Sequence, residues 1–185
     1  MLDGQNIPTS GLEARYNLQA KLTVRPLMET AVGVTIQQDD LSCADVQLLV
    51  AEHLSGMHSS SPPGQVHALA IQSLLAPNVS FFTAWQEEVL CGCGALKELD
   101  HFNGEVKSMR TRAAFLNRGI GQAILDHIVG TARQRRYSRL LLETGSGTAF
   151  EPAHAFYRKN GFEPTASFGE YAATDFNMFM AKHLE

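Results

Sequence analysis

Hydrophobic and polar positions repeat with different periods along the chain, and each change of period predicts a new element. Alternating apolar and polar residues predict a strand over residues 34–37. Apolar residues then recur at intervals of three and four, which predicts a helix over about residues 42–57. A second helix is expected over roughly residues 65–75, between a loop rich in serine and proline and the pair Pro77-Asn78.

Strand patterns dominate the middle of the chain. Residues 79–85 and 89–99 predict two consecutive strands, and residues 105–111 predict a third. The pair Asn103-Gly104 is a strong hairpin signal, so the last two strands are expected to be antiparallel. The chain then continues with a long one-sided helix after Gly119, an apolar strand over 138–144, a short helix over 153–159 and a final strand over 175–183.

The predicted order of elements, βααβββαβαβ, indicates an α/β chain (α+β in some schemes) with one mixed sheet and helices on both faces. The first 33 residues do not share this pattern, because glycine and proline interrupt them repeatedly. We therefore expect an N-terminal extension over residues 1–33, either partly disordered or packed on a partner subunit. One domain is expected over residues 34–185.

Composition argues against several classes of function. The chain has 185 residues, is 44% hydrophobic and carries a net charge of −4, which is unlike a dedicated nucleic-acid binder. It has no apolar run near the ~20 residues of a membrane span, and it does not begin like a secretory signal. Three cysteines, an odd number, indicate reduced thiols and a cytoplasmic location. Cys91-x-Cys93 lacks a second ligand pair, so no metal is expected.

A glycine-rich turn before the long helix is the strongest candidate for ligand binding. It reads Arg118-Gly119-Ile120-Gly121. Glycines let a backbone come close to an anion, and the N–H groups of a helix's first turn point at it. Arg118 would add a positive charge at the same place. The turn therefore suits a phosphate-bearing ligand, although glycines at such a position also serve packing alone.

The longer pattern resembles a known family. The turn and its helix are followed by Leu140-Leu141-Leu142-Glu143-Thr144 and then by Ala155-Phe156-Tyr157-Arg158-Lys159-Asn160-Gly161-Phe162. Together they resemble the GNAT superfamily of acetyl-CoA-dependent N-acetyltransferases, best over residues 88–162. Within it, the chain looks closest to a poorly characterised bacterial branch that acts on small molecules. One departure is Leu116, which stands where the family usually has Gln or Arg.

The resemblance implies both a fold and a reaction. The fold is the GNAT acyl-CoA N-acyltransferase fold, whose mixed central sheet is mostly antiparallel. The co-substrate is acetyl-CoA, without a metal, and the acceptor is the primary amine of a small molecule or amino acid, which attacks directly in a ternary complex. Neither nucleic acid nor membrane is an expected partner, and the resemblance allows a homodimer.

The resemblance also assigns roles to individual residues. Tyr157 takes the place of the family's general acid, which gives a proton to the departing thiolate. Glu105 stands eleven residues before Leu116, the offset of the catalytic glutamate in the histone-acetylating branch. Glu143 is the rival candidate for the base. The expected cofactor-binding residues are Met109, Arg110, Thr111, Leu116, Asn117, Arg118, Gly119, Ile120, Gly121 and Gln122.

Residues for the acceptor are expected in the loop after the first helix, where His58 and Ser61 offer an imidazole and a hydroxyl for a polar ligand. An ordinary surface connection is the alternative for this loop. His53 lies on the apolar stripe of the preceding helix, where a satisfied core or edge histidine is expected rather than a ligand.

Other functions stay open at this point. A protein or peptide N-acetyltransferase would need an open acceptor groove, which the proline-rich loop at 61–64 argues against. A non-catalytic CoA-binding regulatory module would bind the cofactor without turnover. A dinucleotide-binding domain is a weaker alternative, because its third glycine would fall at Ile124.

Overall fold

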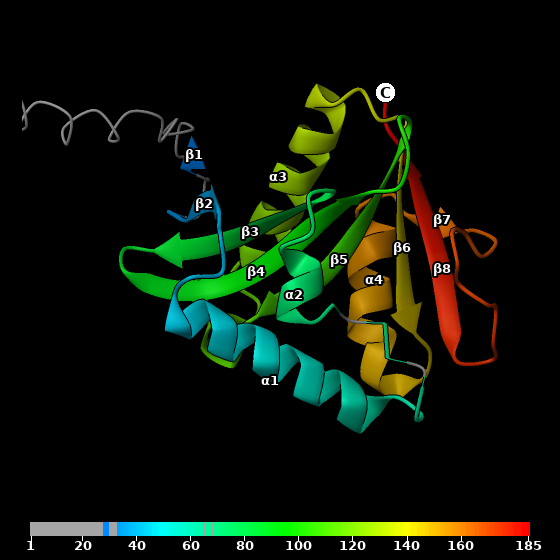
Figure 1. Cartoon of the computed structure of the whole chain (residues 1–185), viewed down its shortest axis with the longest axis horizontal. Helices are drawn as coiled ribbons and strands as arrows, with labels where there is room; N and C mark the ends of the chain where they lie inside the picture. The colour runs from blue at the N-terminus through cyan, green and yellow to red at the C-terminus, as the bar shows by residue number, and fades with distance from the viewer. Residues whose placement is uncertain (1–27, 30–32, 65, 68) are drawn as a thin grey trace, which may run out of the picture.

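The protein is described by a computed structural model covering residues 28–29, 33–64, 66–67 and 69–185 (Figure 1). Its centre is an eight-stranded sheet in the order β1-β2-β3-β4-β5-β6-β8-β7. All neighbouring described strands are antiparallel except β5 and β6, which are parallel. The structure thus confirms the predicted mixed, mostly antiparallel sheet of an α/β fold.

The elements follow the predicted order, with two short strands added. The strands are β1 Met28–Glu29, β2 Thr35–Gln38, β3 Val79–Gln86, β4 Val89–Glu98, β5 Asn103–Thr111, β6 Arg139–Gly145, β7 Glu163–Pro164 and β8 Asn177–His183. The helices are α1 Ala44–Ser60, α2 Ile71–Leu74, α3 Ile120–Gln134 and α4 Glu151–Lys159. Single 3₁₀ turns occupy Ala113–Phe115 and Thr148–Phe150.

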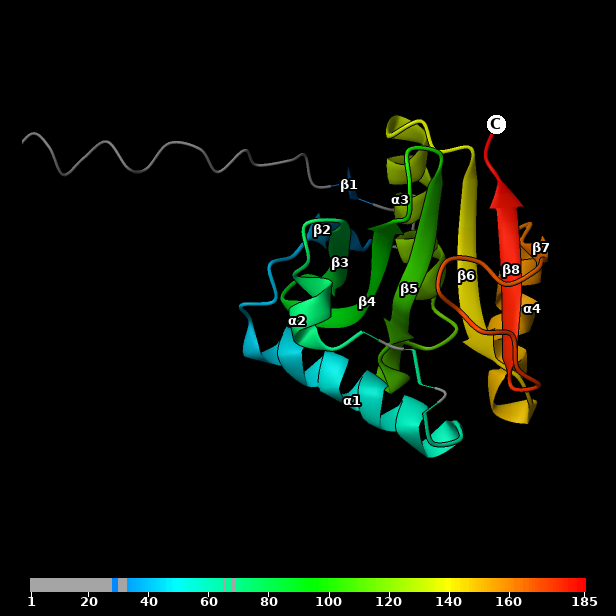
Figure 2. The same cartoon turned by 45° about the vertical axis from the view of Figure 1, so that its right-hand side comes forward.

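Each face of the sheet is covered by helices, as predicted. α1 and α2 lie on one face, where Leu49 and Leu74 pack with Phe81 of β3 (Figure 2). α3 lies on the other face, where Ile124 and Ile128 are fully buried with the side chains of β4, β5 and β6. Each such side chain stabilises the fold by about 1.5–3 kcal/mol relative to an exposed one. The apolar spacing of three and four in the sequence is therefore the pattern of real helix–sheet contacts.

The hairpin of β4 and β5 is antiparallel, as predicted, but its turn does not use the Asn103-Gly104 pair. Asp100 Oδ1 accepts hydrogen bonds from the backbone N–H groups of Phe102 and Asn103, at 2.7 and 2.9 Å. Asn103 itself already belongs to β5. The carboxylate of Asp100 therefore builds the turn, in the manner of an Asx turn.

A bulge interrupts the hairpin near its other end. The pairing of β4 with β5 shifts register between Cys93 and Ala95. Opposite this shift, Ser108 of β5 takes a left-handed conformation with φ 53°, which is uncommon for a residue other than glycine. A bulge bends its strand and re-aims a side chain. Here it changes the direction of β5 where the strand reaches the cavities described below.

The parallel strands β5 and β6 pair over a short length only. Residues Asn103–Glu105 pair with Arg139–Leu141, and no further pairs follow between the described residues of these strands. The two strands separate beyond this point. Side chains of β5 and β6 on either side of the separation then line a cavity.

The predicted helix over residues 65–75 was largely wrong. Only Ile71–Leu74 is helical, while Val66, His67, Leu69 and Ala70 are not. Two prolines precede Gly64, whose φ of 79° is left-handed, and Ala70 has an extended backbone. These residues delay the helix until Ile71. The described residues between Gly64 and α2 therefore form an irregular segment.

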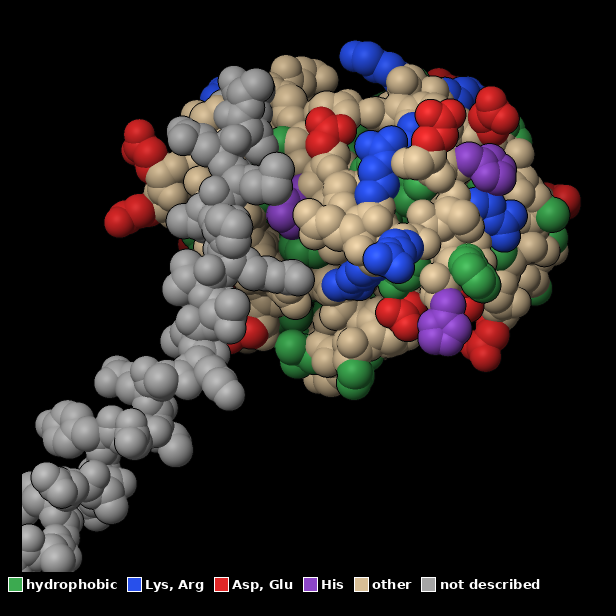
Figure 3. All heavy atoms as spheres, turned by 90° about the horizontal axis from the view of Figure 1, so that it is seen from above, with side chains coloured by type: hydrophobic (Ala, Val, Ile, Leu, Met, Phe, Trp, Pro, Cys, Tyr) green, Lys and Arg blue, Asp and Glu red, His purple; other side chains and the backbone are tan. Residues whose placement is uncertain are grey.

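The expected N-terminal extension falls mostly outside the described residues. The exception is β1, whose Met28 pairs with Ile36 of β2, so the sheet begins before the expected boundary at residue 34. None of the described helices combines the length and apolar character that crossing a bilayer requires. At the end of the molecule where α3 finishes, acidic and basic side chains are interspersed rather than gathered by sign (Figure 3).

Candidate active site

Two neighbouring cavities meet at the open end of the β5–β6 pair. The larger has a volume of ≈ 600 Å³ and the smaller ≈ 140 Å³. Met109, Ala153 and Tyr157 line both. These three residues therefore form the boundary that the two cavities share.

The larger cavity contains the expected cofactor-binding residues. Arg118 is the exception, and its guanidinium instead lies over the Phe115 ring, 5.5 Å from the centroid. The sequence did not indicate that Phe115, α4 and the turn before α4 also form part of the wall of the larger cavity. The lining residues are Met109, Arg110, Thr111, Phe115, Leu116, Asn117, Gly119, Ile120, Gly121, Gln122, Ala149, Pro152, Ala153, Phe156, Tyr157 and Lys159.

The start of α3 opens onto this cavity as an anion-binding terminus. Gly119 is the N-cap, with φ 82°, and none of the described side chains caps the helix. The first helical hydrogen bond comes from Ala123 to Gly119, so the N–H groups of residues 120–122 lack partners within the helix. Such a terminus attracts phosphate through both its N–H groups and its dipole.

Gly121 distinguishes between the two interpretations of the glycine-rich turn, which are phosphate binding and packing alone. A Cβ added there would lie 3.6 Å from Thr111 Oγ1 and 3.8 Å from the Phe156 ring, which are ordinary contacts. Its φ is also not in the left-handed region. Neither packing nor backbone conformation requires glycine at this position. Close approach of a ligand to the backbone remains the physical reason, so the cavity fits a phosphate-bearing cofactor.

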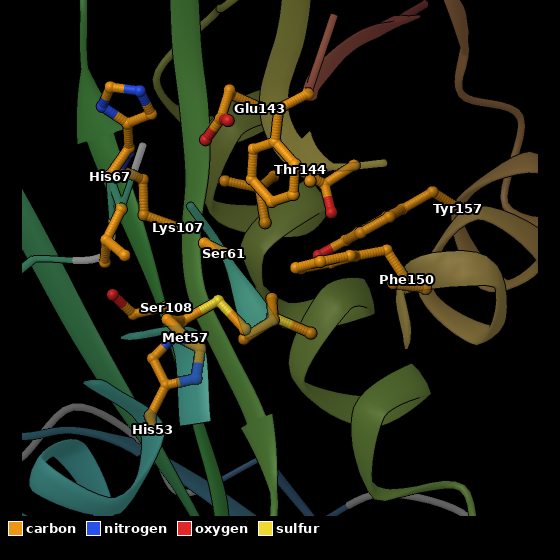
Figure 4. Close-up of a pocket in the computed structure, with 16 residues that line it drawn as sticks. His53, Met57, Ser61, His67, Lys107, Ser108, Glu143, Thr144, Phe150 and Tyr157 are labelled. Atoms are coloured by element: carbon orange, nitrogen blue, oxygen red, sulfur yellow. The ribbon is translucent and has the colours of Figure 1, made fainter. Parts of the chain in front are cut away.

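The smaller cavity lies between α1, the segment before α2, and the separated strands β5 and β6 (Figure 4). Its wall mixes polar, titratable and aromatic side chains. They are His53, Met57, Ser61, Val66, His67, Val106, Lys107, Ser108, Met109, Glu143, Thr144, Gly145, Phe150, Ala153, Tyr157 and Phe176. This composition suits a small polar ligand.

Glu143 is the carboxylate that faces the smaller cavity. It belongs to β6 and is half-buried. Burial raises its pKa to about 7, an effect that the charge of Lys107 opposes and that of Glu105 reinforces. A carboxylate with this pKa exchanges protons readily at neutral pH, which is what a general base requires.

Glu105, the other predicted base, is engaged elsewhere. It is 1% exposed and does not line either cavity. Its Oε1 accepts hydrogen bonds from Lys107 Nζ at 3.1 Å and from the Tyr171 hydroxyl at 2.5 Å. Lys107 also donates to the Tyr171 oxygen. The structure thus places Glu143, and not Glu105, in contact with the cavity.

Tyr157 stands where the two cavities meet. It lies on α4 and packs edge-to-face against Phe156 and Phe162, with ring centroids 5.3 and 5.5 Å apart. Burial raises the pKa of its phenol above the ordinary value. The phenol is therefore protonated at neutral pH and can act as a proton donor to a group in either cavity.

The two residues expected to bind the acceptor are placed differently. Ser61 lines the smaller cavity, whereas His58 is exposed near the end of α1 with its ring bound to the Leu54 carbonyl oxygen at 2.8 Å. The imidazoles in the cavity wall belong to His53 and His67. His53 is buried, as expected, but its Nδ1 has no hydrogen-bond partner among the described residues. The expectation of a satisfied histidine was wrong.

Several residues of this site carried little signal in the sequence. Lys107 and Ser108 lie in a strand whose bulge cannot be read from the periodicity, and His67 lies in the segment mistaken for helix. Tyr171 comes from an irregular segment far along the chain. Within the part of the chain that the structure describes, no three His, Cys, Asp or Glu side chains are grouped to hold a metal ion.

Comparison with known proteins gives consistent matches. The model of the acetyltransferase (GNAT) family matches residues 47–162. An uncharacterized N-acetyltransferase of Bacillus subtilis, YsnE, is 46% identical over 149 residues, which cover 80% of this chain and 99% of that protein. In solved structures, a putative acyl-CoA N-acyltransferase from Klebsiella pneumoniae aligns with a TM-score of 0.68 and 25% identity, over 83% of this chain and 99% of that one.

A third match concerns the cofactor. A GNAT family acetyltransferase from Elizabethkingia anophelis, solved with acetyl-CoA bound, aligns with a TM-score of 0.58 and 17% identity. The alignment covers 82% of this chain and 99% of that one. At this identity the match shows the fold alone, which in the Elizabethkingia anophelis protein holds acetyl-CoA.

Proposed function

The chain belongs to the acetyltransferase (GNAT) family, and from this premise we propose that it transfers the acetyl group of acetyl-CoA to the primary amine of a small molecule. The observation that carries the proposal is the meeting of two cavities at Tyr157. The larger has an anion-binding helix terminus, and the smaller holds a carboxylate whose pKa is near 7. Transfer between two substrates requires such a junction.

The larger cavity supplies the binding groups for acetyl-CoA. The first-turn N–H groups of α3 would hold its pyrophosphate, and β5 backbone groups at Met109–Thr111 would face its pantetheine arm. When bound, acetyl-CoA supplies a thioester carbon to which the amine nitrogen bonds while the carbon–sulfur bond breaks. The remaining work of the protein is to move protons.

We assign removal of the amine proton to Glu143. An amine attacks only when neutral, and an alkylamine of pKa ~10.4 is mostly protonated at pH 7. Above pH 7 the Glu143 carboxylate is mostly ionised, and it lines the cavity proposed for the acceptor. Glu105 has one oxygen committed to Lys107 and Tyr171. The position of Glu143 therefore supports it as the base, and Glu105 as the group that holds Lys107.

We assign the opposite proton transfer to Tyr157. The departing thiolate needs a proton, and the Tyr157 phenol lines the wall shared by the two cavities. Burial raises the pKa of the phenol, and the same dry surroundings raise that of a thiol. The two pKa values therefore shift in the same direction, so a proton can still pass from the phenol to the thiolate. Attack by the neutral amine leaves one excess proton on nitrogen, which balances the proton that Tyr157 gives to sulfur, and the proton that Glu143 first takes from the ammonium group passes to solvent.

The size of the smaller cavity supports a small acceptor over a protein. Its ≈ 140 Å³ suits a molecule of a few non-hydrogen atoms around the amine, and buried side chains of α1 and β5 form much of its wall. A protein acceptor would need a groove along which its backbone could lie. A non-catalytic CoA-binding module would have no use for a carboxylate with a raised pKa beside Tyr157.

The test is a calorimetric titration with acetyl-CoA, with NADH as the control ligand, followed by thiol release with a panel of small amines. We expect micromolar binding of acetyl-CoA alone and turnover with at least one amine. Binding without turnover on any amine would favour the regulatory module. Absence of acetyl-CoA binding would contradict the proposal altogether.

Two further points belong to the proposal. The cysteines Cys43, Cys91 and Cys93 are all free, which supports a reducing, cytoplasmic setting. Pairing of two chains as a homodimer stays a prediction from the family resemblance, to be checked by light scattering.

A further inference from the structure

Two buried polar atoms in the smaller cavity have no partner among the described residues. They are Nδ1 of His53, on α1, and Oγ of Ser108, in the bulge of β5. Each residue is 8% exposed, and both line the cavity. A buried polar group without a hydrogen bond destabilises the fold, so such groups call for an explanation.

The backbone at Ser108 adds to the cost. Its φ of 53° is left-handed, a conformation that glycine adopts without penalty and serine does not. Strain of this kind persists where a function needs the side chain. Here serine keeps its hydroxyl in the cavity wall at a position where glycine would be easier to fold.

The cavity has two chemically different ends. Glu143 lies at one end, while Ser108 and His53 lie at the other (Figure 4). The Glu143 end suits the amine that gives up its proton. The opposite end offers a hydroxyl and an imidazole nitrogen, two groups that can both donate hydrogen bonds.

Charge favours an anion at the second end. Burial is the main cause that lowers the pKa of His53 to about 4, and the positive charge of Arg110 is the second cause. The ring is therefore neutral at pH 7 and carries one N–H, which a ligand can draw to Nδ1. A carboxylate has two oxygens that accept from both donors, and its charge would be attracted by Arg110.

We propose that the smaller cavity selects acceptors that carry a carboxylate, so that Ser108 Oγ and His53 Nδ1 bind the carboxylate while the amine faces Glu143. The acceptor is then an amine-bearing carboxylic acid of the amino-acid class. This inference rests on the proposed function, since it names the substrate class of the same site. It explains why two buried donors and a strained serine occur together.

The first experiment uses the wild-type protein and matched acceptors. Each trio contains an amino acid, its carboxamide and the amine without the carboxyl group, for α-, β- and γ-amino acids. We expect kcat/KM for the best acid to exceed that of its carboxamide and amine by about tenfold or more, because hydrogen bonds to a charged group are the stronger ones. Equal values within every trio would overturn the inference.

The second experiment uses Ser108→Gly and His53→Leu. Ser108→Gly removes the hydroxyl and relieves the left-handed backbone, and His53→Leu removes an unpaired polar atom, so both variants should fold. We expect each to reduce the preference for the acid to within about threefold, mainly through a higher KM for the acid. Matched controls are Ser59→Ala and His101→Asn, which lie on exposed residues outside the cavity and should keep the preference.

The outcomes separate this inference from the proposed function. Turnover of amines and acids alike, or an unchanged preference in both variants, overturns the carboxylate site and leaves the acetyltransferase activity standing. Acetyl-CoA binding without transfer to any member of the panel overturns both. A preference for the carboxamide over the acid would overturn the inference in favour of a neutral polar ligand.

Discussion

At the scale of single residues, the surroundings of Glu143 decide its chemistry. In water the same side chain loses its proton at a pH well below neutral. Burial in the wall of the smaller cavity raises its pKa to about 7. Lys107, itself held by Glu105 and Tyr171, limits this rise. The smaller cavity therefore holds a carboxyl group that is about half ionised at neutral pH.

This pKa predicts the pH dependence of the reaction. Below pH 7 Glu143 is mostly protonated and cannot accept the amine proton, so kcat/KM should rise as the pH increases through about 7. Glu143→Gln should lower kcat/KM by roughly 10²-fold and remove this rise, leaving only the increase due to ionisation of the amine. The measurement is a pH–rate profile of both proteins. Glu88→Gln, in the exposed turn after β3, is the control and should keep the wild-type profile.

Tyr157 gives the second prediction at this scale. Tyr157→Phe keeps the ring packing against Phe156 and Phe162 but removes the proton donor. We expect turnover to fall by about 10–10²-fold while the acetyl-CoA affinity stays within twofold. Tyr137→Phe, whose hydroxyl binds Glu98 away from both cavities, serves as the control. An unaltered turnover in Tyr157→Phe would contradict the general-acid role.

The sequence pointed to these residues only in part. Tyr157 and Glu143 stand in a pattern that identifies the family, so their positions could be anticipated. The sequence favoured Glu105 over Glu143 as the base, and it could not show that Tyr171, 66 residues away along the chain, binds the Glu105 carboxylate. His53 shows the same limit, since helical spacing predicts a buried face and does not show whether Nδ1 finds a partner.

At the scale of elements, the start of α3 is the most informative. Its N-terminus has no side-chain cap among the described residues and opens onto the larger cavity, so a negative charge there would compete with the phosphate. Gly121→Asp should therefore weaken acetyl-CoA binding by at least about 10²-fold in calorimetry. The control is Gly130→Asp, in the same helix, where a side chain meets open space. Equal affinity of the two variants would refute the phosphate site.

Elements with strong periodicity were predicted well, and those without it were not. The spacing in α3 matches its buried face, and the apolar run of β6 matches its central position in the sheet. The segment before α2 has no such regularity, because Val66 and His67 face the smaller cavity rather than a continuous core. These two residues help to line the smaller cavity, and lining a cavity does not require apolar residues at a regular spacing.

At the scale of the whole molecule, ligand binding should be visible in stability. The larger cavity is formed by β5, α3 and α4 together, so acetyl-CoA can bind only when these elements are assembled. At 100 times its Kd, acetyl-CoA should stabilise the fold by about 2.7 kcal/mol. Thermal unfolding should show a rise in Tm for the wild type and for Gly130→Asp, and little or no rise for Gly121→Asp. A ligand-independent Tm in the wild type would contradict cofactor binding.

The overall topology could be predicted because the order of elements, the hairpin of β4 and β5 and the family pattern agree with one another. The shape of the smaller cavity was not accessible, since it arises from segments distant in sequence, such as Ser61 and Phe176, that meet only in the folded chain.

Beyond the three residues that they share, the two cavities differ in which segments form their walls. The larger is built from β5, α3, α4 and the turns before these two helices, whereas the end of α1, the segment before α2 and Phe176 face only the smaller. Substitutions at those positions can alter what the smaller cavity accepts without touching a residue of the larger. Under the proposed assignment of the two cavities, substitutions around the smaller one can therefore change the acceptor while the acetyl donor stays the same.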